Sequence, residues 1–228
     1  MLIKQIQGLK FPDEYIIRFF FKEGLDKRKG SVLELGCGNG NNLTLFYQYG
    51  WKVSGVDINS GPLRQGKTNF KKIRETNKLS PAAKLLQKDM VDFCASYVGP
   101  GFDVLLLPSS IYYLSYPRIK QLFLEIKKQG IVKRGSLIFI RVRTPQDYRR
   151  KKGGKAGAMT FRIDFRETGE SGCLNTFFTA SQLRNLLEAN FTFKNQCWLR
   201  CDFDNYQKKK MVNNSDIIFW GRIKGSKK

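Results

Sequence analysis

The sequence predicts an α/β fold in which a doubly wound, mostly parallel sheet carries helices on both faces. Short apolar runs of strand length alternate along the chain with stretches of helical character, the pattern of a parallel sheet covered by helices. The first four runs each lead to a glycine, an aspartate or a proline, as expected where strands end. Hydrophobic residues make up 41% of the 228 positions, enough to bury a core, so we expect one elaborated domain or at most two small ones.

The first two thirds of the chain supply one early helix and five strands. Residues 13–23 are expected to be helical, because Pro12 stands near the start of this segment and Gly24 follows its end. The five strands that follow are expected over 31–35, 51–56, 83–87, 102–107 and 136–142.

The last third supplies a hairpin, a helix and a final pair of strands. Apolar and charged residues alternate over 161–166, which predicts a hairpin strand with Gly169 to Gly172 as its turn. Residues 179–189 predict a helix with Thr179 or Ser181 as its N-cap. Two more strands are expected over 192–201 and 215–223, joined by the polar segment 202–214.

The composition excludes several kinds of site. The chain has no histidine, so Ser-His-Asp and Cys-His catalysis and His-ligated metals are impossible. The five cysteines are scattered without C-x-x-C spacing, so we expect free thiols and no metal site. No apolar run reaches the roughly 18 residues that span a bilayer, and the N-terminus lacks the features of a signal peptide. We therefore expect a cytoplasmic protein with no membrane partner.

The positive charge is large and uneven. Lys and Arg number 41 against 19 Asp and Glu, a formal charge of +22. Residues 118–155 carry thirteen basic and two acidic side chains, half of the surplus, with a peak at 149–155 that we expect to be a mobile loop. Residues 31–60 hold only one basic and two acidic side chains. The charge therefore indicates an anionic partner, either a nucleic acid or an acidic small molecule.

The glycine-rich segment Gly36-Cys37-Gly38-Asn39-Gly40 follows a buried strand and predicts a tight turn with close backbone approach to a ligand. The dinucleotide fingerprint G-x-G-x-x-G fails, because its third glycine would be Asn41 or Leu43. Residues 61–68 match the phosphate-loop pattern G-x-x-x-x-G-K-[ST], but Pro62 indicates a helix start, which places the match inside a helix. Nucleotide hydrolysis is therefore disfavoured.

Residues 32–40, Val-Leu-Glu-Leu-Gly-Cys-Gly-Asn-Gly, closely resemble the first motif of class I S-adenosylmethionine (SAM)-dependent methyltransferases. The resemblance continues in order through Asp57, Lys88-Asp89-Met90, 102–107 and 135–139. It implies a Rossmann-like sheet of seven strands with an antiparallel C-terminal strand and an inserted β-hairpin. The implied single domain, 1–228, comprises an N-terminal helical segment (1–30), a cofactor-binding core (31–142), a hairpin insertion that acts as a lid over the acceptor (143–178), and a last helix and strand pair (179–228).

The same resemblance implies SAM as cofactor, S-adenosylhomocysteine (SAH) as product and no metal. It assigns Asp57 to the ribose hydroxyls, Asp89 to the adenine amine, and Glu34 to the amino group of the methionine moiety. The implied cofactor-binding residues are Glu34, Gly36, Cys37, Gly38, Asn39, Gly40, Asp57, Ile58, Asp89, Met90 and Pro108. Alternatively, Gly36 and Gly40 are turn residues, Asp89 caps a helix, and Glu34 is salt-bridged in its strand.

The segment 107–114 lacks the [DNS]-P-P-[YFW] motif of enzymes that methylate base amines and is more similar to small-molecule methyltransferases. One of its two tyrosines is expected to face the site and the other the core. If the acceptor needs a base, a Tyr, an Asp or water must serve. The catalytic candidates are Tyr112, Tyr113, Asp147 and Tyr148, and the candidates for substrate binding are Ser109, Arg141 and Arg143. The two arginines alternate on one strand face, where they would bind a carboxylate or phosphate or form a solvated strand end.

These features favour methyl transfer to the O or N of a small anionic acceptor, such as a phosphorylated or nucleotide-linked sugar or a carboxylate metabolite, by direct in-line displacement. Two alternatives stay open. One is an RNA or DNA methyltransferase that uses the basic surface of 118–155. The other is a non-catalytic SAM-binding protein.

Overall fold

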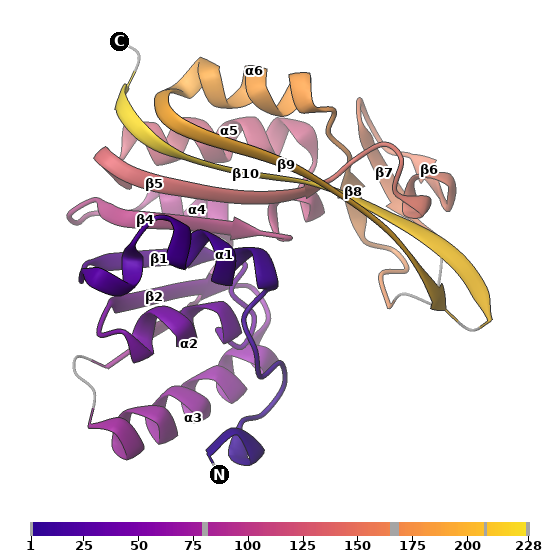
Figure 1. Cartoon of the computed structure of the whole chain (residues 1–228). Coiled ribbons are helices and arrows are strands. Elements are labelled where there is room, and N and C mark those ends of the chain that lie inside the picture. The colour runs from indigo at the N-terminus through magenta and orange to yellow at the C-terminus, as the bar shows by residue number, and fades with distance from the viewer. Residues whose placement is uncertain (1, 79–81, 165–168, 208, 227–228) are drawn as a thin grey trace.

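A computed structural model describes residues 2–78, 82–164, 169–207 and 209–226. Its main sheet has seven strands in the order β3-β2-β1-β4-β5-β10-β9, with β10 antiparallel to both neighbours and the other pairs parallel (Figure 1). The strands are β1 (Ser31–Leu35), β2 (Lys52–Asp57), β3 (Lys84–Gln87), β4 (Phe102–Pro108), β5 (Val132–Arg143), β9 (Phe191–Gln207) and β10 (Lys210–Ser226). The predicted doubly wound, mostly parallel sheet of seven strands is confirmed.

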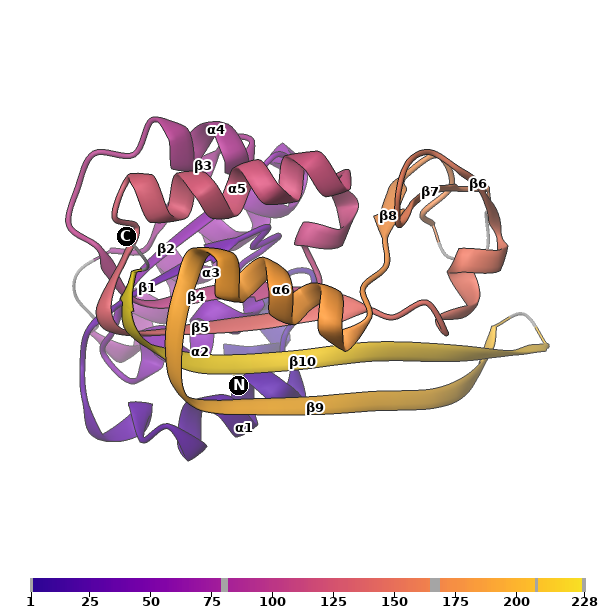
Figure 2. The same cartoon turned by 90° about the horizontal axis from the view of Figure 1, so that it is seen from above.

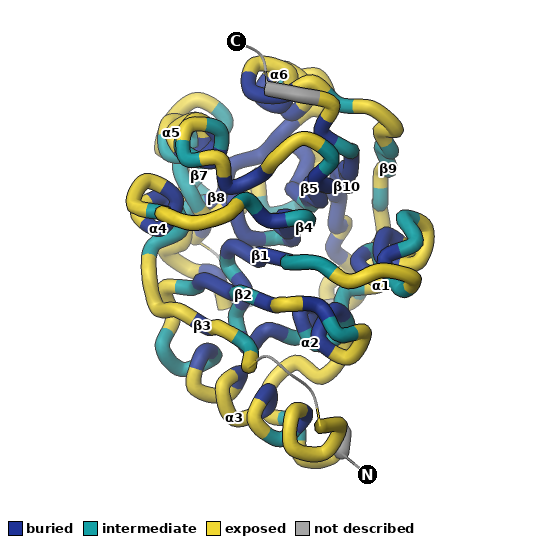
Figure 3. Tube along the Cα trace, turned by 90° about the vertical axis from the view of Figure 1, so that its left-hand side faces the viewer, coloured by how far each residue is buried: buried dark blue, intermediate teal, exposed yellow. Residues whose placement is uncertain are grey.

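Helices cover both faces of this sheet. One face carries α1 (Glu14–Lys22), α2 (Asn41–Gln48) and α3 (Ser60–Asn77), and the other carries α4 (Met90–Ala95), α5 (Tyr116–Lys128) and α6 (Ala180–Asn190). Figure 3 shows α4 and α5 on one side of the buried strands and α1 and α2 on the other. Successive strand residues point to opposite faces, so Val32 packs toward α1–α3 while Leu33 and Leu35 pack toward α4–α6. Two hydrophobic cores result, one on each face of the sheet.

A small second sheet is inserted between β5 and α6. The inserted segment begins with the 3-10 helix η4 (Tyr148–Lys151). It then forms the strands β6 (Gly153–Lys155), β7 (Thr160–Ile163) and β8 (Leu174–Thr176), which pair antiparallel in the order β6-β7-β8. We call this unit the insert. The hairpin predicted within it is confirmed, although Phe165 and Arg166 lie outside the described residues. The expected loop over 149–155 is instead the end of η4 together with β6, because the backbone of β6 pairs with β7.

The final strand pair is longer than predicted. The polar segment 202–214 was expected to link two strands, but residues 202–207 and 210–214 continue the β9–β10 ladder from Asp202↔Ser215 to Lys210↔Gln207. The prediction of a connector was wrong because the residues of this ribbon are mostly polar and exposed, with Val212 and Asn214 buried, so they show no run of apolar residues. We call residues 202–214 the arm. Figure 2 shows the arm extending beyond the body of the molecule, beside the insert.

The structure confirms two local predictions from the sequence, one for residues 61–68 and one for the N-cap of α6. Residues 61–68, which match the phosphate-loop pattern, lie inside α3 and therefore form no phosphate-binding loop, as predicted. Thr179 is the N-cap of α6, with its hydroxyl accepting from the backbone N–H of Gln182 in a capping box. Within the described part of the chain, no helix has the length and apolar character needed to cross a membrane.

Candidate active site

The turn between β1 and α2 is fixed by its glycines. Gly36, Gly38 and Gly40 have φ values of 78°, 54° and 75°, in the left-handed region that favours glycine. A Cβ on Gly36 would lie 2.4 Å from the Cβ of Ser110, and one on Gly40 would lie 2.7 Å from the Phe70 ring. The turn therefore needs glycine at Gly36 and Gly40 for space as well as for conformation.

Asp57 joins this turn to the start of α3. It ends β2, and its Oδ2 accepts a hydrogen bond from the backbone N–H of Gly38 at 2.8 Å. Its Oδ1 accepts from the N–H of Asn59, also at 2.8 Å. The carboxylate thus holds the glycine turn and the β2–α3 connection at the same edge of the sheet, where ligands bind in folds of this type.

Two adjoining cavities open at this edge. The first has a volume of about 520 Å³ and the second about 570 Å³, and both are lined by Gly36 and Ser109. Of the residues predicted from the sequence, the first cavity is also lined by Asp57, Ile58, Asp89, Met90 and Tyr113. The second is also lined by Glu34, Cys37, Gly38, Asn39 and Pro108. Most of the predicted cofactor residues therefore surround two spaces that meet at Gly36 and Ser109.

Glu34 presents an unpartnered oxygen in this region. Its side chain is 1% exposed, and Oε1 accepts from Nδ2 of Asn42 at 2.7 Å. Oε2 is buried and has no hydrogen-bond partner among the described residues, so the salt-bridge alternative is wrong. Burial raises the pKa of Glu34 to about 8, an effect that the Asn42 hydrogen bond opposes and that nearby Asp57 and Asp13 reinforce. A buried carboxyl oxygen beside a cavity indicates a ligand group that would pair with it.

Asp89 has a structural role in the free protein. It is the N-cap of α4, where its Oδ1 accepts from the N–H groups of Val91 and Asp92 at 2.7 and 3.1 Å. The same oxygen forms an ion pair with Arg118 at 2.9 Å. The helix-cap alternative is therefore observed, while contact with adenine stays a prediction for a residue that also lines the first cavity.

The acceptor side of the first cavity is built on the segment after β4. Ser109 has a φ of 54°, an uncommon conformation for a residue with a side chain. The hydroxyl of Ser110 is buried without a partner among the described residues. Tyr113 lines the cavity, whereas Tyr112 is buried and lies against the Arg143 guanidinium, 4.2 Å from its ring centre. The two tyrosines therefore face different surroundings, and Tyr113 is the one at the cavity.

A buried charge cluster closes this side of the cavity. Glu170, in the turn between β7 and β8, accepts from the Tyr113 hydroxyl at 2.6 Å and forms ion pairs with Arg143 at 2.6 Å and Arg149 at 2.5 Å. Burial would raise the pKa of Glu170, but the hydrogen bond and charge of Arg143 outweigh it and hold this pKa below its usual value. An ionised Glu170 thus links the β7–β8 connection to β5 through Arg143, to η4 through Arg149 and to the segment after β4 through Tyr113.

Arg141 and Arg143 are neither solvated nor directed into a cavity. Arg141 pairs with Asp13 at 2.5 Å and with Asp216 at 2.6 Å, and Arg143 pairs with Glu170 and Asn175. The alternative of a solvated strand end is wrong, because both side chains are largely buried. Binding of a substrate by these arginines stays a prediction. It would require the acceptor to accept hydrogen bonds from guanidinium N–H groups that already donate to side chains of the protein.

Asp147 and Tyr148 lie outside both cavity linings. Asp147 is 2% exposed and accepts hydrogen bonds from Arg149 and from the N–H of Ser215. The Tyr148 ring packs against the Arg149 guanidinium, whose centre is 4.6 Å from that of the ring. The geometry gives no support to either residue as a base, because Asp147 is committed to Arg149. Gly40 also lies outside both linings and acts as the N-cap position of α2.

Sequence reasoning missed three parts of the site. The outer wall of the second cavity is formed by the segment before α1, through Gly8, Leu9, Phe11, Pro12 and Asp13. The insert was predicted as a lid over the acceptor, but the residues that it contributes to the first cavity, Gly169, Glu170, Cys173 and Leu174, were not named as site residues. Asn42 holds Glu34 from α2. The run of asparagines around Gly40 and the single acid between Gly169 and Gly172 were the available signals.

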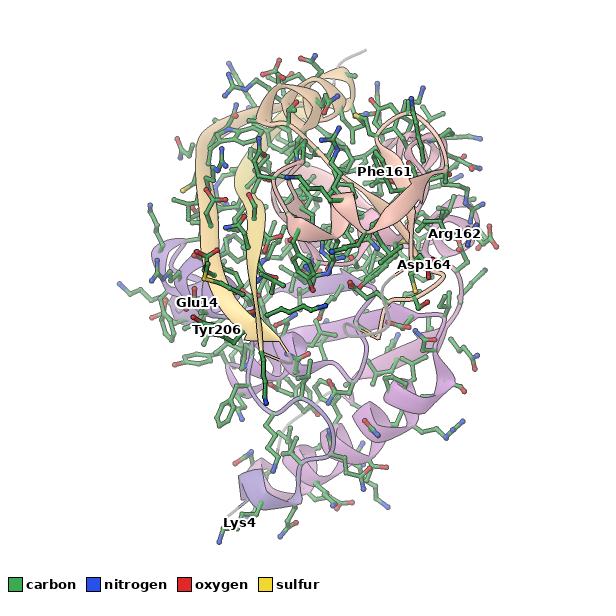
Figure 4. The ribbon with its side chains drawn as sticks, turned by 90° about the vertical axis from the view of Figure 1, so that its right-hand side faces the viewer. Lys4, Glu14, Phe161, Arg162, Asp164 and Tyr206 are labelled. Carbon is green, nitrogen blue, oxygen red and sulfur yellow. The ribbon has the colours of Figure 1, made fainter. Side chains whose placement is uncertain are left out.

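The insert and the arm flank the cavity edge of the sheet. Figure 4 views this end of the molecule, with Phe161, Arg162 and Asp164 of the insert on one side and Tyr206 of the arm on the other. Arg149 connects the two units, because its Nη1 also donates to Oδ1 of Asn214 at 3.2 Å. The acceptor side is therefore bordered by two elements that the minimal sheet does not require.

The chain is similar to known methyltransferases in both sequence and fold. The sequence matches the family model described as a methyltransferase domain over residues 5–194. A SAM-dependent methyltransferase from Methanosarcina mazei has a TM-score of 0.66 and 19% identity, covering 94% of this chain and 99% of that chain. The N-methyltransferase NodS from Bradyrhizobium japonicum, in complex with SAH, has a TM-score of 0.56 and 12% identity, covering 92% and 86%. Magnesium protoporphyrin IX methyltransferase from Synechocystis, with bound SAM, has a TM-score of 0.57 and 10% identity, covering 92% and 77%. No curated protein gives a significant match.

The family match spans most of the chain, and the solved structures share its sheet with an antiparallel C-terminal strand. The glycine turn, the acidic end of β2 and the adjoining cavities lie where this fold binds its ligands. The chain therefore belongs to the methyltransferase domain family, has the class I fold, and is a SAM-dependent methyltransferase.

Proposed function

We propose that the protein transfers the methyl group of SAM to an O or N atom of a small anionic acceptor by direct in-line displacement. The observation that carries this proposal is the pair of adjoining cavities, both bordered by predicted cofactor residues and the first lined also by the insert. Their volumes of about 520 and 570 Å³ suit small molecules.

The residues present fit SAM. The unpartnered Oε2 of Glu34 suits the amino group of the methionine moiety, and Gly36 leaves its backbone open where the cavities meet. Asp57 at the end of β2 suits the ribose hydroxyls, with Asp89 and Met90 beside the adenine. Bound SAM would supply a methyl group on a positively charged sulfur. The chain's contribution is to bind both reactants and align them, which can lower a barrier by roughly 7–11 kcal/mol in favourable cases.

Tyr113 is better suited to orient the acceptor than to remove its proton. Burial raises the pKa of Tyr113 well above its ordinary value, so the phenol stays protonated at neutral pH. That proton is donated to Glu170, which leaves the phenolic oxygen to accept a hydrogen bond from the cavity. Tyr113 would therefore orient an acceptor that carries an O–H or N–H at its reacting end, beside the Ser110 hydroxyl, which has no partner in the described part of the chain.

The anionic character of the acceptor is supported by the outer surface of the insert. Among the described residues of the insert, the exposed basic side chains are Arg150, Lys151, Lys152, Lys155 and Arg162. The cavity wall itself carries Lys88 together with the acids Asp57, Asp89 and Glu170. The basic surface would therefore act by attracting an anion to the entrance, rather than by direct pairing at the reacting atom. All five cysteines are free thiols, as suits a cytoplasmic protein.

A screen with SAM carrying a tritiated methyl group tests this proposal. Its substrates are a small-molecule extract separated by anion exchange, the same extract after phosphatase treatment, and total RNA. Label in acidic small molecules is expected. Label confined to RNA would favour the nucleic-acid alternative, for which the same exposed cations could bind phosphates. Label confined to neutral or cationic compounds would overturn the anionic acceptor. Binding of SAM without transfer to any acceptor would favour the non-catalytic alternative.

A further inference from the structure

Residues 6–13, which we call the strap, have no helix or strand of their own between the 3-10 helix η1 (Leu2–Gln5) and α1. Backbone groups in such a segment need partners from elsewhere in the protein. Asparagine side chains supply them here. Asn39 Nδ2 donates to the carbonyls of Gln7 and Leu9, Asn69 Nδ2 to that of Gln7, and Asn41 Nδ2 to that of Phe11. In the other direction, the N–H groups of Gln7 and Asp13 donate to Asn69 Oδ1 and Asn42 Oδ1.

All four asparagines belong to elements that build the cofactor side of the site. Asn39 lies in the glycine turn, Asn41 and Asn42 are the first residues of α2, and Asn69 lies in α3. The strap they hold forms the outer wall of the second cavity. The same cavity is lined by Glu34, whose Oε2 has no hydrogen-bond partner among the described residues. The strap and Glu34 therefore line one space.

Asn42 connects the strap to Glu34. Its side chain is buried, with 7% of the residue exposed. Nδ2 donates to Glu34 Oε1 at 2.7 Å, and Oδ1 accepts from the N–H of Asp13 at 2.9 Å. Because one end of the amide must face an acceptor and the other a donor, its orientation is determined by both contacts. With Oε1 engaged by Asn42, Oε2 is the oxygen of Glu34 left for a ligand.

The connection continues beyond the strap. The Asp13 carboxylate caps α1 by accepting from the N–H of Tyr15 at 2.8 Å, and its other oxygen pairs with Arg141 on β5. Arg141 also pairs with Asp216 on β10. One hydrogen-bonded path thus runs from Glu34 through Asn42 and Asp13 to the strand edge next to the acceptor side.

We propose that Asn42 is a positioning residue of the cofactor site, which holds the Glu34 carboxyl toward the methionine amino group and, with the same amide, holds the strap over that moiety. This inference rests on the proposed cofactor placement. It predicts that Asn42, which lines the second cavity, affects cofactor affinity by holding Glu34 and the strap in place. It also predicts that SAH binding and strap closure reinforce each other.

The test compares two neighbouring asparagines. Asn42→Ala and Asn42→Leu remove both contacts, the second with a side chain of similar size, whereas Asn41→Ala removes one exposed strap bond and leaves Glu34 untouched. SAH affinity is measured by isothermal titration for each full-length variant. We expect Asn41→Ala to bind within about threefold of wild type, and both Asn42 variants to bind at least about tenfold more weakly, because Glu34 loses a buried hydrogen bond.

Hydrogen exchange of the strap gives a second readout. In wild type, saturating SAH is expected to slow exchange of the Asp13 amide and of the strap, and this protection should be lost in Asn42→Leu. Two results would overturn the proposed role of Asn42 while leaving the cofactor site intact. One is equal SAH affinity in the Asn41 and Asn42 variants, and the other is a hydrogen-exchange rate of the wild-type strap that SAH leaves unchanged. Failure of wild type to bind either SAM or SAH would instead overturn the cofactor site, and this inference with it.

Discussion

Replacing Glu34 by glutamine should remove most of the pH dependence of cofactor binding. Burial raises the pKa of Glu34 to about 8, with the Asn42 hydrogen bond acting in the opposite direction and the Asp57 and Asp13 carboxylates adding to the rise. A positively charged amino group would pair with the ionised form. Binding at lower pH must therefore remove a proton from Glu34. Glutamine has the same shape and no proton to lose.

The magnitude follows from that pKa. With a pKa of about 8, Glu34 of the free protein would be mostly protonated at pH 6 and about half protonated at pH 8. The affinity of wild type for SAH should therefore rise by more than tenfold between pH 6 and pH 8, or about 2 kcal/mol, with close to one proton released at pH 6.

Isothermal titration at pH 6, 7 and 8, in two buffers of different ionisation enthalpy, measures both the affinity and the proton release. SAH is the same in both titrations, so its own ionisation cancels in the difference between wild type and Glu34→Gln. Glu14→Gln, which alters an exposed acid in α1, is the matched control and should behave as wild type. If wild type shows a flat affinity from pH 6 to 8, or if Glu34→Gln keeps the slope, the assignment of Glu34 to the amino group is refuted.

Three further predictions follow from the same geometry. Asp57→Ala should weaken SAH binding by about 1–3 kcal/mol in isothermal titration, through lost ribose hydrogen bonds and a loosened turn, and an unchanged affinity would contradict its role. Gly36→Ala should abolish SAH binding and lower the melting temperature, because its Cβ would lie 2.4 Å from that of Ser110. Gly38→Ala should have a milder effect, because no neighbouring atom lies within 4 Å of its Cβ. Equal effects of the two substitutions would contradict this reasoning. Glu170→Gln should cost about 3 kcal/mol in urea unfolding, because buried Arg143 loses its carboxylate partner and Arg149 keeps only Asp147, with SAH affinity nearly unchanged; an unchanged midpoint would contradict the anchoring role of Glu170.

The main sheet could be predicted from the sequence because its signals are local. Each parallel strand is a short apolar run, and each run ends at a turn or polar residue such as Gly36, Asp57 or Pro108. The glycine turn was recognisable for the same reason, since its conformation depends on residues within five positions. The arm was missed because its residues are mostly polar and, apart from Val212 and Asn214, largely exposed, so that cross-strand pairing defines its strands.

The acceptor side was harder to predict because it depends on charges brought together from distant parts of the chain. Arg141 and Arg143 were identified as candidate anion-binding residues, but the residues that pair with them, Asp13, Asp216 and Glu170, lie 27 to 128 positions away. Asp147 was identified as a candidate base from its place after β5, whereas the fold places it in a buried ion pair. Position in the sequence indicates which edge of the sheet a side chain reaches, and the tertiary partners decide its charge environment.

The most direct test of the account is a crystal structure of the SAH complex. In that structure SAH should span both cavities across Gly36, with its amino group within hydrogen-bonding distance of Glu34 Oε2, its ribose at Asp57 and its adenine beside Met90. The sulfur should face the Ser110 and Tyr113 side of the first cavity. SAH bound away from the glycine turn, or with its amino group remote from Glu34, would contradict the account.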